Sequence, residues 1–236
     1  MGIVTVWGPP GSGKTTLAID LAFALSAQNR SVCLISAESY SELSARLQIH
    51  VQRKNSLLAA YRQPGTLNQI VCKVEELLFM LSVPSGSDVF SQEENSRAVR
   101  ELLKQARSFF DFVIVDCPSG AGSTLSAWAM RMADDVLLLT GGRPRDGEWH
   151  KSYRRAVWEV SSKLIYVCTE IVADFDYTAL FDLIGAVPEI RLPYIRDAEY
   201  LQVTHRTLFH AGSGKQLRSY SDRIKVLCER LEGKRT

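Results

Sequence analysis

The chain has 236 residues, 46% of them hydrophobic, and a formal net charge of +2. Such a chain can bury a full core as one α/β domain, and we interpret residues 1–236 in this way. No stretch is long and apolar enough to span a bilayer, and the first residues lack the pattern of a secretory signal, so we expect a cytoplasmic protein. The five cysteines are scattered without a C-x-x-C pair, which favours reduced, buried thiols over a metal or redox site.

The first elements form a strand, a glycine-rich loop and a helix. The apolar residues 3–7 predict the strand, and residues 15–25 have apolar side chains at helical spacing. The loop between them matches G-x-x-x-x-G-K-[ST] in the context that this pattern requires, so we expect it to bind phosphate through its N–H groups. We expect Lys14 to reach the β- and γ-phosphates and Thr15 to be a Mg²⁺ ligand. The predicted nucleotide-binding residues of this segment are Gly8, Pro9, Pro10, Gly11, Ser12, Gly13, Lys14, Thr15 and Thr16.

Strand and helix signals alternate through the rest of the chain. Further strands are predicted over 31–36, 79–86 with its loop, 112–116, 135–140, 163–168 and within 186–194. Helices are predicted over 41–47, 57–60, 67–78, 93–110, 123–133 and 215–231. The strand segments are apolar without alternation, as strands buried on both faces must be. We therefore predict a P-loop NTPase fold, an α/β three-layer sandwich with a mostly parallel central sheet and its ligand beyond the carboxyl ends of the strands. The sequence AGSGK at 211–215 echoes the phosphate loop, but no apolar strand precedes it, and we interpret it as an ordinary loop.

An aspartate closes the strand predicted over 112–116. Asp116 lies where a carboxylate that serves a phosphate-bound Mg²⁺ belongs. Four residues later, Gly120 leaves the backbone free to approach a γ-phosphate, so the intervening turn would distinguish ATP from ADP by ordering or relaxing. An ordinary strand-to-helix turn is the alternative interpretation.

Glu38 is a further acidic candidate. It follows the second strand, which a right-handed crossover would place parallel and adjacent to the first. A carboxylate there can orient an attacking water or hold one bound to Mg²⁺. The alternative is an exposed loop glutamate. The catalytic candidates are thus Lys14, Glu38 and Asp116, and the metal candidates are Thr15 and Asp116.

The order of these segments resembles that of the MinD/ParA-type ATPases, P-loop proteins related by a deviant Walker A motif. The resemblance extends over VTVWGPPGSGKTTLAIDLAFALSAQNRSVCLISAE, LLFMLSVPSGSD, ARSFFDFVIVDCPSG and MADDVLLLT. It ends in LPYIRDAEYLQVTHR, which is similar to the family's late strand and the loop that flanks the base. The resemblance implies ATP or ADP with Mg²⁺, a homodimer whose two sites face each other, and a protein partner that is recruited or released.

The chain departs from the family pattern at three places. Pro9 stands where the family carries a signature lysine that reaches the phosphates of the opposite subunit. Of two acidic positions after the second strand, the first is Ser36 and the second is Glu38, where aspartate is usual. The adenine-contacting asparagine would fall near Cys168 or Thr169, and neither matches. We therefore expect a divergent member with slow hydrolysis.

Other nucleotide proteins share parts of this pattern. AAA+ ATPases also carry GPPGSGKT, but they prefer Asp-Glu where this chain has Asp116-Cys117. A RecA/KaiC-type ATPase would explain VCLISAES, with Glu38 as the catalytic acid, although not the D-x-P-x-G turn. A nucleotide-dependent scaffold without turnover is a further hypothesis, because the sequence does not give a rate.

Two basic segments bear on partners. The first comprises Arg143, Arg145, Lys151, Arg154 and Arg155, which fits DNA phosphates, although a solvated helix face is the favoured interpretation. The second is the helix predicted over 215–231, with apolar residues at helical spacing and basic residues around them. MinD-type proteins touch membranes with such a helix, but docking on the sheet gives the same pattern and is favoured here.

Overall fold

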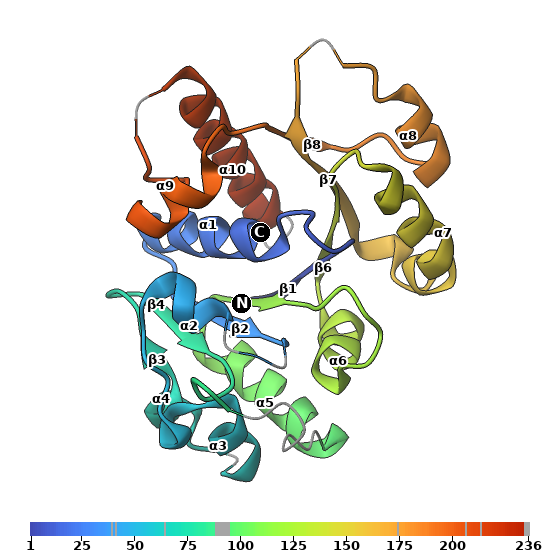
Figure 1. Ribbon diagram of the computed structural model, residues 1–236. Helices are drawn as coiled ribbons and strands as arrows, with labels where there is room; N and C mark the ends of the chain where they lie inside the picture. Colours follow the sequence, from blue (N-terminus) through green and yellow to red (C-terminus); the bar gives the residue numbers. More distant parts are fainter. Residues whose placement is uncertain are drawn as a thin grey trace.

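One sheet forms the middle layer of the computed structural model, which describes residues 1–233 apart from 39, 41, 64, 88–94, 174, 206 and 213 (Figure 1). Its eight strands within the described residues are β1 (Gly2–Trp7), β2 (Val32–Ser36), β3 (Cys72–Lys73), β4 (Leu78–Leu81), β5 (Phe112–Asp116), β6 (Asp135–Thr140), β7 (Leu164–Ile171) and β8 (Ile190–Pro193). Their order is β3-β4-β2-β5-β1-β6-β7-β8, and all neighbours are parallel except β3 and β4. The sequence-based prediction of a mostly parallel P-loop NTPase sheet is confirmed.

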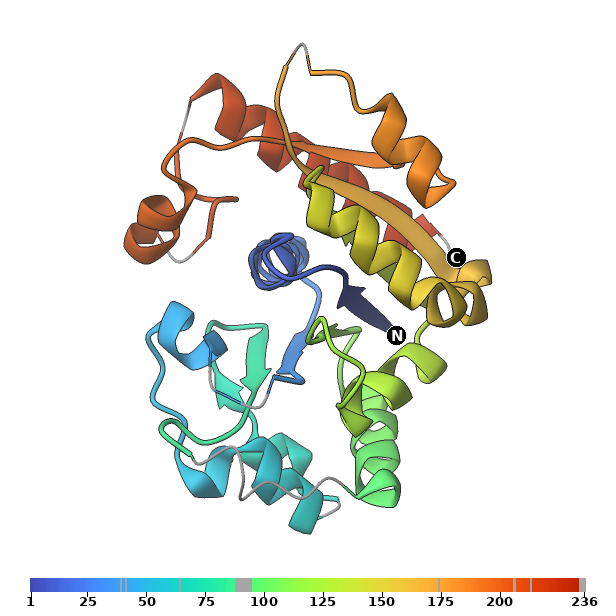
Figure 2. The same ribbon diagram turned by 45° about the vertical axis from the view of Figure 1, so that its right-hand side comes forward.

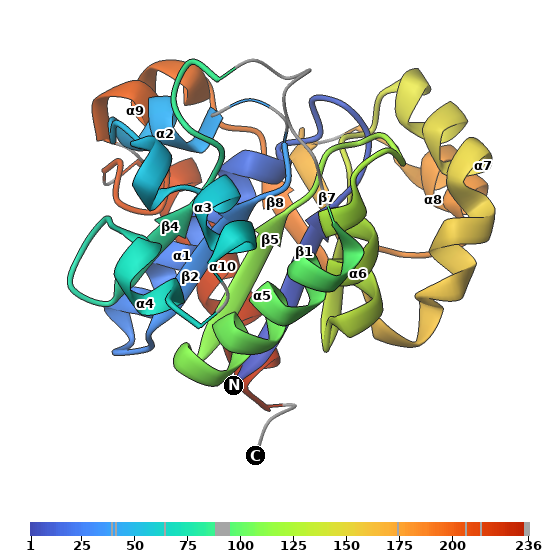
Figure 3. The same cartoon turned by 90° about the horizontal axis from the view of Figure 1, so that it is seen from below.

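Helices cover both faces of this sheet. They are α1 (Lys14–Ala27), α2 (Glu42–Leu47), α3 (Leu57–Arg62), α4 (Leu67–Ile70), α5 (Ser96–Phe109), α6 (Thr124–Met132), α7 (Pro144–Glu159), α8 (Thr178–Ile184), α9 (Ala198–His205) and α10 (Lys215–Gly233). The helices α1 and α10 lie on one face, and Figure 3 shows α5 and α6 on the other. In Figure 2, α1 is seen nearly end-on at the centre of the molecule.

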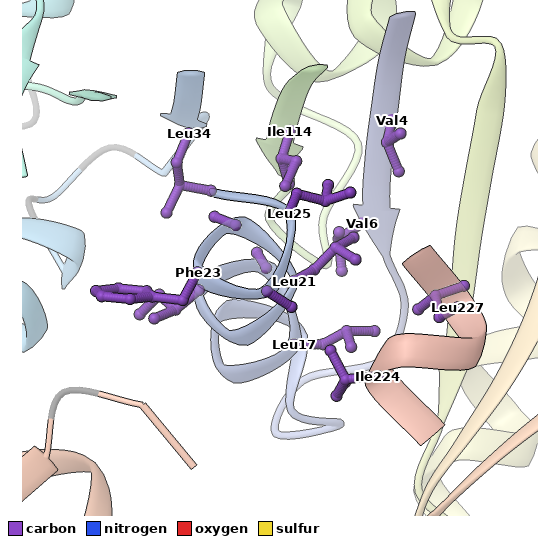
Figure 4. Packing of buried hydrophobic residues seen from close by; sticks show 14 of the residues in the cluster. Val4, Val6, Leu17, Leu21, Phe23, Leu25, Leu34, Ile114, Ile224 and Leu227 are labelled. Atoms are coloured by element: carbon purple, nitrogen blue, oxygen red, sulfur yellow. The ribbon is translucent and has the colours of Figure 1, made fainter. Parts of the chain in front are cut away.

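The alternation of side chains along β1 explains the two cores. Val4 and Val6 point to the face of α1 and α10, whereas Ile3 and Trp7 point to the face of α5, α6 and α7. Figure 4 shows Leu17, Leu21 and Leu25 of α1 between the strands and α10. Because α1 is enclosed in this way, its position is fixed by the core, and so is the loop that precedes it.

A buried carboxylate joins α1 to the end of the chain. Asp20 of α1 is fully buried, and its carboxylate accepts hydrogen bonds from the hydroxyl of Thr207, from the N–H of Phe209 and, at 2.6 Å, from the hydroxyl of Tyr220 on α10. The apolar stripe of α10 is buried against α1 and β8, including Ile224 and Leu227. The last helix, α10, is therefore docked on one face of the sheet, beside α1.

Two expectations about elements are wrong. The strand β2 does not neighbour β1, because β5 lies between them and pairs with both. The helix expected over 67–78 ends at Ile70, since Cys72 and Lys73 pair with β4 in an antiparallel hairpin. In that hairpin the N–H groups of Val74 and Glu75 bond to the carbonyl of Leu78, so this segment joins the sheet edge instead of continuing the helix.

Other boundaries shift by a few residues. The helix expected over 93–110 starts at Ser96, because the side chain of Asn95 caps it by accepting from the N–H groups of Arg97 and Ala98. Residues 93 and 94 lie outside the described part of the chain, as do residue 41 before α2 and residue 213 in the loop before α10.

Candidate nucleotide-binding site

The loop between β1 and α1 has the backbone of an anion-binding turn. Gly13, the N-cap of α1, has a φ of 83°, in the left-handed region that glycine enters without strain. Gly8 packs against β6 so closely that a Cβ would lie 2.8 Å from the carbonyl oxygen of Leu139. The loop thus ends at the N-terminus of a buried helix, where N–H groups and the helix dipole favour an anion.

Lys14 is a buried cation that faces this loop. Its Nζ donates to the carbonyl of Pro9 at 3.2 Å and to the hydroxyl of Ser119 at 2.7 Å. Burial lowers the pKa of Lys14, and the nearby carboxylates of Asp116 and Glu38 oppose that shift. A cation with so few fixed partners in a partly desolvated place attracts an anionic ligand.

Asp116 lies beneath the first turn of α1. Its Oδ2 accepts a hydrogen bond of 2.7 Å from the hydroxyl of Thr15, while its buried Oδ1 has no hydrogen-bond partner among the described residues. Burial raises the pKa of Asp116 to about 7, although the hydrogen bond from Thr15 and the charge of Lys14 act in the opposite direction. An unsatisfied carboxylate oxygen next to a hydroxyl suits a hydrated divalent cation.

Most of the predicted residues lie around one cavity of about 890 Å³. Those that line it are Pro10, Gly11, Gly13, Lys14, Thr15, Thr16, Glu38 and Gly120. Gly8, Pro9, Ser12 and Asp116 are not part of the lining; the carbonyl of Pro9 accepts from Ser12 and Lys14, and Asp116 is bonded to the lining residue Thr15. A Cβ on Gly120 would meet nothing within 4 Å, so the described residues do not by themselves require glycine at this position.

Glu38 reaches the cavity even though its strand is one place further from β1 than expected. The hydroxyl of Ser36 accepts from its backbone N–H at 3.3 Å, and its carboxyl lines the same cavity as Lys14. Burial raises the pKa of Glu38, with the charge of Lys14 opposing and that of Glu42 reinforcing the shift. The two side chains therefore lie close enough for the charge of each to shift the pKa of the other.

A second cavity of about 370 Å³ adjoins the first. Thr169, at the position expected for an adenine-contacting asparagine, donates its hydroxyl hydrogen to the carbonyl of Ser12 at 2.9 Å, which ties β7 to the loop. Cys168 is fully buried. The far side of this cavity is formed by residues of β8 and the loop after it, including Pro193 and Tyr194.

The turn after Asp116 is held from two sides. The side chain of Ser119 accepts from Lys14, and its carbonyl accepts from the indole Nε1 of Trp149 on α7 at 3.0 Å. Trp149 in turn stacks on Tyr153 and meets Trp7 edge-on, with ring centroids 4.5 and 4.7 Å apart. The turn is thereby connected to the end of β1 and to the start of α7.

Comparison with known proteins identifies the family. A family model described as an AAA domain matches residues 3–143. The septum site-determining protein MinD of Synechocystis sp. is 26% identical over 139 residues, which are 58% of this chain and 52% of that protein. The chain belongs to the MinD/ParA-type P-loop ATPases. It spans about half the length of the curated relatives that it matches.

Solved structures share the fold of this MinD/ParA-type chain. A ParA family ATPase from Chlorobium tepidum superposes with a TM-score of 0.80 at 19% identity and covers 97% of this chain and 99% of its own. The MinD protein of Pyrococcus horikoshii, solved with Mg-ADP, gives 0.78 at 17% identity and covers 99% and 98%. Among the described residues, no helix has the length and apolar character needed to cross a membrane.

Several residues of the MinD/ParA-type site were not predicted from the sequence. The hydroxyl of Thr16 accepts from Arg46 at 3.0 Å and from Gln202 at 3.1 Å, so α2 and α9 both reach the loop. Arg143 donates to the carbonyl of Gly11 at 3.2 Å. No local motif marks these three side chains, because their role depends on elements that meet only in the fold.

Proposed function

We propose that this chain is an ATP-dependent switch that binds ATP and ADP with Mg²⁺ and hydrolyses ATP slowly. The observation that carries the proposal is that Lys14, Thr15 and Glu38 line one cavity and that Thr15 is hydrogen-bonded to the buried Asp116. The unpartnered Oδ1 of Asp116 fits a metal-bound water, so Thr15 and Asp116 would hold Mg²⁺. The ion would neutralise charge on the phosphates.

Each side chain has a distinct task in this proposal. Lys14 exchanges the hydroxyl of Ser119 for phosphate oxygens, which frees the turn that ends at Gly120. Glu38 orients a water beside the terminal phosphate, and a raised pKa makes its carboxylate a better proton acceptor. The smaller cavity, with Pro193 and Tyr194 on its far side, receives the base.

The switch would act through other macromolecules. The name of the Synechocystis relative describes the placement of a division septum, and we extend a positioning role, exerted on an unidentified protein partner, to this chain. A homodimer with facing sites is part of the proposal. DNA and membrane contact are not favoured, since Arg143 faces the phosphate loop and the apolar stripe of α10 is buried.

The decisive experiment is nucleotide binding by calorimetry. Lys14→Ala should weaken ATP and ADP binding by about a hundredfold, because it removes the buried cation that faces the loop. Lys225→Ala, on the exposed side of α10, is the matched control and should bind as the wild type does. Wild-type protein without affinity for either nucleotide would overturn the proposal.

Phosphate release separates the switch from a scaffold. The scaffold hypothesis has its own support in Pro9, which removes the cation that relatives place beside the nucleotide. A nucleotide-dependent scaffold would bind ATP and release no phosphate, with or without a partner. A slow but measurable rate that Lys14→Ala abolishes would support the enzyme.

A further inference from the structure

The two cavities meet at Arg143, which lines both of them. Its backbone is fixed at the start of α7, because the carboxylate of Asp146 accepts from the N–H of Gly141 at 2.8 Å and from that of Arg143 at 3.2 Å. Asp146 is 1% exposed, so this anchor is buried. The arginine is therefore held beside the phosphate loop by the fold and does not project freely from a surface helix.

The guanidinium of Arg143 bridges the loop and β7. One nitrogen donates to the carbonyl of Gly11, and the other pairs with Oε2 of Glu170 at 2.5 Å. Glu170 has a φ of 57°, a left-handed backbone conformation that is uncommon for residues other than glycine and that clusters at functional sites. The neighbouring Thr169 is hydrogen-bonded to the carbonyl of Ser12, so the backbone next to Glu170 is attached to the loop.

The charged side chains around the larger cavity indicate a role for Arg143. The carboxylates that line it are those of Glu38, Glu42, Glu170 and Glu199, and the cations that line it are Lys14, Arg46 and Arg143. Arg46 is already engaged by Glu42 and Thr16. Pro9 has neither a cation nor a backbone N–H to offer. Arg143 is also paired, with Glu170, but this pair is more exposed than that of Arg46 and Glu42 and lines both cavities, so an anionic ligand can compete for its guanidinium. Arg145 approaches Gly11 as well but lines neither cavity.

We propose that Arg143 is a phosphate ligand in its own subunit, and that it exchanges Glu170 for the α- and β-phosphates when a nucleotide binds. The inference rests on the proposed function and goes beyond it, because it replaces a charge supplied across a dimer with one supplied within the chain. An arginine suits this exchange, since its planar fork pairs with phosphate oxygens as well as with a carboxylate.

Calorimetry with three variants tests the contact. Arg143→Gln should weaken ADP and ATP binding about tenfold, the effect of one charge-assisted contact at a partly exposed site. Arg143→Lys should recover part of the loss, because lysine keeps the charge without the planar fork. Arg155→Gln, on the same helix and almost fully exposed, should bind like the wild type. Thermal melting shows whether each variant is folded. Equal affinities of Arg143→Gln and the wild type would overturn the inference while leaving the proposed function intact, whereas a wild type without affinity removes both.

Glu170→Gln tests the exchange. It should tighten nucleotide binding severalfold, because Arg143 loses the carboxylate that competes with phosphate. A loss as large as that of Arg143→Gln would show that Glu170 itself contacts the nucleotide and would overturn the exchange.

Mixing two variants tests whether the arginine acts within its own subunit. In a mixture of Arg143→Gln and Lys14→Ala, the hydrolysis rate should equal the sum of the separate rates. If Arg143 instead reached across a dimer, the Lys14→Ala subunit would supply an intact Arg143 to the site of the Arg143→Gln subunit. The hydrolysis rate of the mixture would then exceed the sum of the separate rates.

Discussion

Asp116 combines a buried carboxyl with a proposed role, near Mg²⁺, that needs its charge. Burial raises its pKa to about 7 without ligand, so near neutral pH the carboxyl is only partly ionised. Between the unfolded pKa of about 4 and this value, the folded state holds a proton that the unfolded state lacks. The stability contributed by this group is therefore present at low pH and declines as pH rises towards 7. A cation beside the carboxylate would lower this pKa again, because it stabilises the ionised form.

We predict that Asp116→Asn separates these two effects. Without nucleotide, the variant should gain stability relative to the wild type as pH rises from 4 to 8, by on the order of a few kcal/mol, because no buried charge forms. With nucleotide, wild-type affinity for Mg-ATP should increase between pH 6 and pH 8, whereas the variant should show a flat profile and little Mg²⁺ dependence. Urea melts and calorimetry over this pH range measure both. An unchanged Mg²⁺ titration in the variant would remove Asp116 from the site.

A substitution at Glu38 separates an effect on ATP hydrolysis from an effect on ATP binding. Glu38→Gln should lower ATP turnover by about a hundredfold with ATP affinity nearly unchanged, because the amide cannot accept a proton from water. Glu76→Gln, in the turn before β4, is the control and should turn over ATP at the wild-type rate. Equal hydrolysis by the wild type and Glu38→Gln would leave Glu38 as an ordinary cavity-lining carboxyl.

Motif spacing predicts some of these residues and is silent on others. Lys14, Thr15 and Asp116 were predictable because a glycine-rich turn and a strand end fix their surroundings within a few residues. Arg143 meets Gly11 across 132 positions and Gln202 meets Thr16 across 186, so no local pattern marks either contact. The same arginine was interpreted as part of a solvated basic cluster, which still describes Arg154 and Arg155.

At the level of elements, α7 is coupled to the turn that follows β5. The indole of Trp149 carries that coupling through its bond to the carbonyl of Ser119, and its ring is held by Trp7 and Tyr153. Since Lys14 holds the hydroxyl of the same serine, a ligand that draws Lys14 away changes the surroundings of Trp149.

We predict that Trp149→Phe weakens this connection while keeping most of the aromatic packing. The variant should lose about 1 kcal/mol of unfolding free energy, the usual contribution of one hydrogen bond. It should also lose the change in tryptophan fluorescence that ATP induces. Trp158→Phe, an exposed residue on the same helix, is the control for both measurements. A full ATP-induced signal in Trp149→Phe would assign the response to another tryptophan.

Apolar runs predicted most elements, and the misassigned helix over 67–78 shows their limit. Leucine, isoleucine and valine at 67, 70, 71, 74 and 78 fit helical spacing, but residues 72–78 belong to a short edge hairpin and its turn. Whether a segment at a sheet edge forms a strand depends on the strand with which it pairs, here β4. The spacing of apolar residues within the segment itself carries no information about that partner. The place of β5 between β1 and β2 was missed for the same reason.

At the scale of the whole molecule, Pro9 bears on assembly. Because proline cannot reach across a dimer, we predict a hydrolysis rate per molecule that changes little with protein concentration. We also predict a dimer that forms to the same extent without nucleotide, with ADP and with ATP. Sedimentation in the three states beside a turnover assay over a wide protein range measures both. A monomer that dimerises only with ATP, with activity rising steeply as it does, would contradict both expectations.

The carboxylate of Asp20 also sets an order of events during synthesis. Its partner Tyr220 lies 200 positions later in the chain, and Gln202 reaches the loop helix across a similar distance. A nascent chain that has emerged only as far as β8 has the glycine-rich loop and Asp116 but leaves Asp20 without the groups that satisfy it, at a cost of several kcal/mol if buried. We therefore expect α1 to reach its final packing only after α10 has left the ribosome, so that the proposed nucleotide site would be completed late in translation.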